Sequence, residues 1–267
     1  MLFPIRSGAA GAPPWSYEMN ASPTLRRPLS LVAAIFLPLL LAACGRVPGQ
    51  FEILNDQIPA AGCEVPVNPT VYQGIGRLDL SIARANADSA YLFFPLIENN
   101  LPASKNSAQD PNQIQLTGFN IDITPLSGTS PDTNTVLIGN ALAHFRTAWS
   151  GGVASGGAQI SAIVDAFPVA LAEQLLNQGS VGNDPSAVLN LSIQALGTTT
   201  FGNKMQSDPF NFPLEICVGC LVANVQPCPF TSTPANPGNA CNPAQDAPVD
   251  CCTANGALVC PPPVATQ

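Results

Sequence analysis

The chain is poor in charge, and above all in positive charge. Only 10% of its 267 residues are charged, and nine Lys and Arg stand against seventeen Asp and Glu. After residue 43 the balance is six basic against sixteen acidic residues, a formal net charge of −10. Nucleic acids are bound through many phosphate contacts from clustered Lys and Arg, so the sequence excludes a nucleic-acid partner. The same negative charge would repel an anionic membrane surface.

Histidine is nearly absent, since His144 is the only one in the chain. It alternates with neighbours in Ala143-His144-Phe145-Arg146, so we interpret it as an ordinary strand residue. None of the hydrolase, zinc-protease, dinucleotide or phosphate-loop motifs occurs. Acidic residues are scattered singly, which gives no pair of carboxylates of the glycosidase type. The sequence therefore predicts no catalytic residues, no cofactor and no metal site.

Long hydrophobic runs are absent too. A bilayer-spanning helix needs roughly 20 apolar residues, and no apolar run of that length occurs in the chain. The main apolar run occupies residues 29–43 and follows Arg26 and Arg27. A short positive region, a short apolar region and then small residues are typical of a secretory signal peptide. Such signals begin a few residues before the arginines, so Met19 is a better predicted start than Met1.

The apolar run ends at Leu41-Ala42-Ala43-Cys44, which resembles the lipobox of bacterial lipoproteins. In that family the signal peptide is removed before the cysteine, whose thiol carries a diacylglycerol and whose new amine is acylated. The resemblance implies a signal peptide at residues 1–43 and a membrane anchor of palmitate-type chains on Cys44. Gly45 follows where Asp would favour the inner membrane, so the resemblance implies the outer membrane. The alternative is an ordinary signal peptide with an incidental cysteine.

Eight further cysteines follow Cys44. An even number in an exported chain indicates disulfides, here four, whose connectivity the sequence leaves open. The first of them can pair only with a cysteine at the distant end of the chain, which would join the two ends of the fold. The eight are Cys63, Cys217, Cys220, Cys228, Cys241, Cys251, Cys252 and Cys260.

Alternating apolar residues recur along the middle of the chain. They predict a mainly β domain at residues 63–216, a β-sandwich with an immunoglobulin-like arrangement, after a tether at residues 44–62. A barrel is the alternative. Pro95 predicts a strand end or bulge, because proline cannot donate to a strand ladder. Pro168 and Gly179 bracket one predicted short helix. The strands are expected at residues 75–82, 91–97, 114–123, 141–149, 157–164, 188–196, 198–202 and 210–216.

The composition changes at Cys217. Residues 218–267 contain no Lys or Arg but six cysteines and nine prolines, with few large apolar side chains. We expect residues 217–267 to be a segment ordered by disulfides alone, and the sandwich to fold without it. Within it, Cys217-Val218-Gly219-Cys220 has the spacing of a zinc or redox motif. A zinc site needs a second ligand pair, and thioredoxin-like chemistry needs a βαβ setting. A structural disulfide is the favoured interpretation.

Two hypotheses for function follow. The first is a non-catalytic, lipid-anchored envelope protein with a structural or binding role, whose partner is another envelope protein or a polysaccharide. The second is an envelope hydrolase with catalytic residues dispersed in sequence. Buried carboxylates facing one another across a groove would favour the second.

Overall fold

The structure of the chain is a computed structural model that describes residues 49–66, 71–86, 90–105, 109–127, 131–178, 181, 187–230 and 234–261. The described residues belong to one compact unit. The predicted signal peptide, the lipobox and Cys44 lie outside the described residues.

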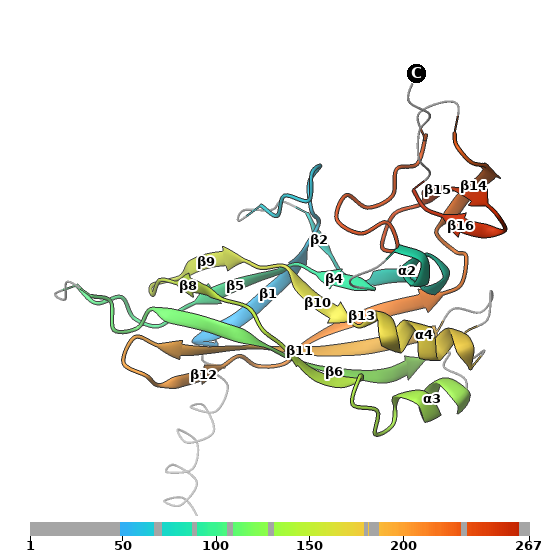
Figure 1. The fold of residues 1–267 in the computed structure, drawn as a ribbon. Coiled ribbons are helices and arrows are strands. Elements are labelled where there is room, and N and C mark those ends of the chain that lie inside the picture. The colour runs from blue at the N-terminus through green and yellow to red at the C-terminus, as the bar shows by residue number, and fades with distance from the viewer. Residues whose placement is uncertain are drawn as a thin grey trace, which may run out of the picture. The chain divides into compact units, whose positions relative to one another are not determined.

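The fold is mainly β, as predicted, and its strands form four sheets (Figure 1). The largest has the order β3-β13-β11-β6-β7, with β12 beside β11 and β8 beside β6. The other orders are β2-β1-β5-β9, β10-β4 and β14-β15-β16. The strands are β1 Phe51–Gln57, β2 Tyr72–Gln73, β3 Gly76–Asp79, β4 Tyr91–Phe93, β5 Pro95–Asn99, β6 Ile114–Ser127, β7 His144–Thr147, β8 Gly151–Val153, β9 Ala158–Ser161, β10 Val164–Phe167, β11 Ala187–Thr199, β12 Lys204–Gln206, β13 Phe210–Cys217, β14 Val222–Pro227, β15 Val249–Ala254 and β16 Ala257–Val259.

The large sheet separates apolar from polar residues by strict alternation. Along β11, Leu189, Leu191 and Ile193 are buried, whereas the residues between them point to the other face and are partly exposed. The inner face of this sheet shares one apolar core with the two sheets β2-β1-β5-β9 and β10-β4. Phe93 of β4, for example, packs on Phe212 of β13 with ring centroids 5.3 Å apart. This layered core is that of a sandwich, whereas the immunoglobulin-like arrangement stays a prediction.

Several local expectations are confirmed. The strand break predicted at Pro95 is present: β4 ends at Phe93 and β5 begins at Pro95. The predicted helix is α4 Val169–Asn177, which follows Pro168 and buries Leu171 and Leu175. The long strands predicted around residues 114–123, 188–196 and 210–216 are β6, β11 and β13.

Two helices were not predicted. α2 Leu80–Asn86 replaces the last part of the strand expected at residues 75–82, and α3 Pro131–Leu137 lies where neither a strand nor a helix was expected. Leu78, Leu80 and Ile82 are all fully buried. Their alternation resembles that of a strand. The chain nevertheless changes from strand to helix after Asp79, so Leu80 and Ile82 are buried as residues of a helix.

The predicted tether at residues 44–62 is wrong in its second half. β1 Phe51–Gln57 lies between β2 and β5, and Phe51 and Ile53 belong to the core. The folded part therefore begins well before Cys63. The apolar alternation of β1 is short, and so short a pattern does not distinguish a strand from a spacer.

The predicted boundary at Cys217 is also wrong, because the Cys-rich segment is built into the sandwich. Residues 242–246, which we call the strap, run along β3 and β4. The carbonyl oxygen of Ala244 accepts a hydrogen bond from the backbone N–H of Asp79. The backbone N–H of Asp246 donates to the carbonyl oxygen of Arg77. Val249 and Cys251 are members of the common core. The apolar residues of this segment are few, but they complete a shared core rather than form their own.

The strap is also tied covalently, since Cys63 pairs with Cys241 across 178 residues of sequence. This confirms the expectation that Cys63 pairs with the distal segment. A cross-link that closes so long a loop removes much conformational entropy from the unfolded chain.

We predict that Cys63→Ser lowers the free energy of unfolding by about 2–5 kcal/mol. Cys241→Ser should cost the same, and the double variant should cost no more than either single one, because all three remove one bridge. Urea unfolding of the otherwise oxidised protein measures this. A double variant whose loss equals the sum of the single losses would contradict the pairing.

Candidate functional site

The eight cysteines predicted to form disulfides do so. Besides the Cys63–Cys241 bridge, the pairs are Cys217–Cys220, Cys228–Cys252 and Cys251–Cys260. Cys228–Cys252 and Cys251–Cys260 hold the small sheet β14-β15-β16 together. The Cys217–Cys220 bridge lies where β13 ends, as a disulfide rather than as two thiols.

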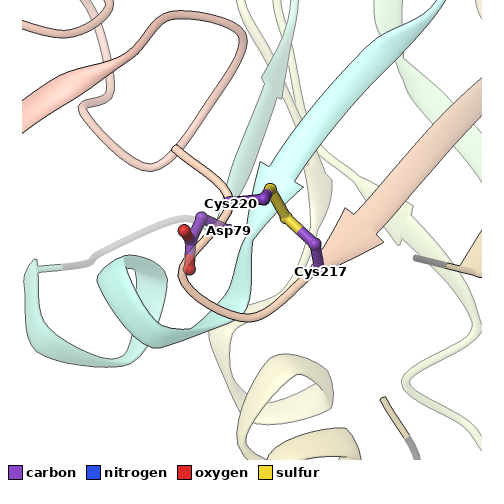
Figure 2. Close-up of side chains that lie close together, drawn as sticks. All are labelled: Asp79, Cys217 and Cys220. Carbon is purple, nitrogen blue, oxygen red and sulfur yellow. A yellow bond between two sulfur atoms is a disulfide. The ribbon is translucent and has the colours of Figure 1, made fainter. Parts of the chain in front are cut away.

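Asp79 lies beside the Cys217–Cys220 bridge, as Figure 2 shows. It is the last residue of β3, directly before helix α2, and it is fully buried. Its Oδ1 accepts hydrogen bonds from the backbone N–H of Ser81 at 3.0 Å and from the Ser81 hydroxyl at 2.6 Å. A carboxylate that accepts from the second N–H of a helix is an N-cap, which explains why the helix begins here.

The same carboxylate also holds the Cys217–Cys220 loop. Oδ1 accepts from the N–H of Gly219 at 2.9 Å, and Oδ2 accepts from the N–H of Leu221 at 3.0 Å. Gly219 has φ +78°, a left-handed conformation that glycine adopts without strain and that turns its N–H toward the carboxylate. Asp79 thus joins β3, α2 and the loop after β13 through four hydrogen bonds.

The group is compact enough to suggest a metal site, since ligand atoms of Asp79, Cys217 and Cys220 lie within 4.8 Å of one another. The chemistry of the donors argues against this. Metals bind thiolates, and both sulfurs are shared in a disulfide. The carboxylate oxygens are engaged by four N–H and O–H donors. The arrangement therefore acts as a structural joint, in agreement with the favoured interpretation of the CxxC spacing.

A second acidic group, which sequence reasoning missed, consists of Asp246, the last residue of the strap, and Asp56 of β1. Asp246 Oδ1 accepts from the backbone N–H of Arg77 at 2.9 Å and from the hydroxyl of Tyr91 at 3.2 Å. Its Oδ2 accepts from the side-chain amide of Gln245 at 3.0 Å. Asp56, which is 1% exposed, accepts from the backbone N–H of Phe94 at 2.8 Å.

Burial perturbs this group strongly. It raises the pKa of Asp56 well above its usual value, and the nearby charge of Asp246 raises it further. Burial likewise raises the pKa of Asp246 and of the Tyr91 hydroxyl. Shifts of this kind occur at catalytic sites but also in structural networks. Asp246 borders a hollow of about 140 Å³ together with Arg77 and Glu215. Asp56 does not line it.

A third acidic residue, Asp250, organises the Cys-rich segment. Its Oδ1 accepts from the side-chain amides of Asn224 at 2.7 Å and Asn236 at 2.9 Å. Its Oδ2 accepts from the backbone N–H groups of Ala235 at 2.8 Å and Asn236 at 3.0 Å. These bonds, above all those from Asn236, lower the pKa of Asp250 to about 2. The residue fixes the loop before β15 onto β14.

A larger hollow of about 440 Å³ lies on the outer face of the large sheet. Its lining joins four strands: Thr117 from β6, Arg146 from β7, Leu196 and Thr198 from β11, and Lys204 and Gln206 from β12. Sequence reasoning did not bring these residues together. A signal was present, since Gly118 and Gly197 interrupt two strand patterns, and a glycine inside a strand indicates a bulge.

His144 lies on this outer face as a residue of β7, as expected. Its Nδ1 is 2.9 Å from Oδ1 of Asp122 on β6, and both side chains are about half exposed. An exposed pair of this kind contributes little to stability.

No protein-family model matches the chain, and a search of the curated proteins finds no sequence match. Among the described residues, every helix is too short or too polar to cross a membrane.

We predict that Asp79→Ala lowers the free energy of unfolding by about 2–4 kcal/mol. It removes a helix cap and leaves the buried N–H of Leu221 without its acceptor. Asp122→Ala is the matched control, because it removes an exposed aspartate and should cost at most about 1 kcal/mol. Thermal or urea unfolding measures both. Equal losses for the two variants would show that Asp79 contributes no more to stability than an exposed aspartate does.

Asp56 and Asp250 should respond to pH in opposite ways. The raised native pKa of Asp56 gives a stabilising contribution that is complete below the unfolded pKa of about 3.9 and is lost as the pH rises through the native value. The lowered pKa of Asp250 gives a contribution that is present above about 3.9 and is lost as the pH falls toward 2.

Urea unfolding from pH 2 to pH 9 should therefore separate Asp56→Asn from Asp250→Asn. In Asp56→Asn the free energy of unfolding should fall less toward alkaline pH than in the wild type. The fall that remains belongs to Asp246. The second variant should lose stability at neutral pH and lose part of the fall toward acid pH. Parallel pH profiles for the two variants and the wild type would contradict both assignments.

Proposed function

We propose that the protein is a lipid-anchored component of the bacterial cell envelope, held in the outer membrane by acyl chains on Cys44, with a non-catalytic structural or binding role. The observation that carries this is how the cysteines divide. Four disulfides account for all eight cysteines after the lipobox. Disulfides of this number are typical of exported proteins.

The four pairs among the described residues leave over one of the nine cysteines in the sequence, Cys44. An odd cysteine in an exported chain needs another use. Its position at the end of Leu41-Ala42-Ala43-Cys44 supports lipid attachment as that use. Gly45 rather than Asp supports the outer membrane by the same family resemblance.

A binding role is supported by the outer face of the large sheet. It is polar, it carries the hollow of about 440 Å³ bordered by Arg146 and Lys204, and a hollow of that size suits a small ligand or a segment of a larger one. The partners in question are another envelope protein or a polysaccharide.

The envelope hydrolase is the second candidate, and the acidic group formed by Asp56 and Asp246 favours it. Asp56 and Asp246 are carboxylates with raised pKa values, one of which borders a hollow. Two features weigh against it. Asp56 is 1% exposed and does not reach the hollow. Asp246 is engaged by Arg77, Tyr91 and Gln245 in holding the strap. A structural use accounts for both.

The anchor is tested by metabolic labelling. Expressed in a Gram-negative host, the protein should incorporate labelled palmitate and partition into the detergent phase, and Cys44→Ser should abolish both. Cys63→Ser is the matched control, because it also removes a cysteine but should keep the label. Label that survives Cys44→Ser would refute lipid attachment at this residue.

A further inference from the structure

We propose that the hollow between Arg146 and Lys204 binds an acidic saccharide, a sugar that carries carboxylate or phosphate groups. This rests on the binding role proposed above and names the ligand class for it. Four observations carry it: the β-bulge that shapes the hollow, the way Arg146 is held, the charge of the lining, and the polar surface that surrounds it.

The hollow lies at a β-bulge. In the pairing of β6 with β11, Leu116 stands opposite Gly197 and Gly118 stands opposite Leu196, so Thr117 between them has no partner residue. Gly118 has φ +142°, a conformation that favours glycine, and a Cβ on it would collide with the carbonyl oxygen of Thr147. Bulges of this kind re-aim side chains beside binding and active sites. Here the extra residue is part of the lining.

The bulge holds Arg146 in a defined position. Nη2 of Arg146 donates to the hydroxyl of Thr117 at 3.1 Å and to its carbonyl oxygen at 3.3 Å. A guanidinium carries five N–H donors. Nε and Nη1 therefore stay available for a ligand on a side chain whose orientation is already fixed, which lowers the entropic cost of binding.

The lining has positive charge only. Arg146 and Lys204 come from strands on opposite sides of β6 and β11, and among the residues that the structure describes no carboxylate lines the hollow. Elsewhere on this face Asp122 is hydrogen-bonded to His144, and Glu215 forms an ion pair with Arg77. In the described part of the chain neither Arg146 nor Lys204 forms an ion pair with a carboxylate. In so acidic a chain, a lining that holds two cations outside any ion pair favours an anionic ligand.

The rest of the lining favours a sugar over a bare anion or an acidic peptide. Thr198 supplies a hydroxyl and Gln206 an amide, and such groups both donate and accept hydrogen bonds as sugar hydroxyls do. Leu196 supplies an apolar surface. Uncharged amides continue across the sheet, where Gln206 donates to Gln194 at 2.6 Å and Asn190 donates to Asn211 at 3.1 Å. Such a surface suits a chain of hydroxyl groups.

The test uses the full mature protein, purified in detergent, and isothermal titration calorimetry at low salt. The probes are trigalacturonate, glucose 6-phosphate, the neutral sugar maltotriose and the peptide triglutamate. We expect trigalacturonate or glucose 6-phosphate to bind, maltotriose to bind much more weakly, and added salt to weaken the acidic probes. Arg146→Gln and Lys204→Gln should each weaken the acidic sugar about tenfold, since each removes a charge-assisted contact.

Lys105→Gln is the matched control, because it makes the same change in net charge at an exposed residue that does not line the hollow. It should leave affinity unchanged, and unfolding curves should show that all three variants fold. Failure of both acidic sugars to bind, equal binding by the Arg146→Gln/Lys204→Gln double variant, or equal affinity for triglutamate would each overturn the proposal. None of these outcomes bears on palmitate labelling, so failure of the sugar site and failure of the lipid anchor are distinguishable.

Discussion

This fold depends on the hydrogen bonds that buried carboxylates accept in place of pairing with a cation. A chain with so few Lys and Arg cannot pair its acids, and a buried charge without compensation is costly. Asp79 and Asp250 meet this constraint with four hydrogen bonds each, from backbone N–H groups, a hydroxyl and amides. Because the donors come from distant parts of the chain, satisfying each acid also fixes the geometry of several elements at once.

This explains how a segment so poor in apolar residues is ordered. The side chain of Gln245 pairs with the main chain of Leu92, accepting at 2.8 Å and donating at 3.0 Å, as a neighbouring strand would. Asp246 beside it binds the backbone of Arg77. The strap thus completes the hydrogen bonding of β3 and β4, while Val249 and Cys251 add to the common core. The disulfides reinforce an interface that is already specified by polar contacts.

The parts of the fold that follow from local pattern could be predicted from the sequence. The alternation along residues 188–196, the break at Pro95 and the helix after Pro168 each depend on neighbouring residues alone. The helix at Leu80 could not be predicted in that way, because its cap, Asp79, is oriented partly by Gly219 and Leu221. The same holds for the strap, whose polar residues resemble a loop until their partners on β3 and β4 are known.

The lining of the hollow on the large sheet could not be predicted for a related reason, although Gly118 and Gly197 indicate a bulge there. Arg146 and Lys204 are far apart in sequence, and they border one hollow only because β7 and β12 lie on either side of the β6–β11 pair. The register shift at Gly197 decides which side chains face outward there, and a shift of one residue would exchange the two faces. Asp79 and Asp250 are turned inward to N–H donors, and Glu215 is paired with Arg77 on the surface. Among the described residues, the hollow on the outer face is therefore lined by two cations that form no ion pair.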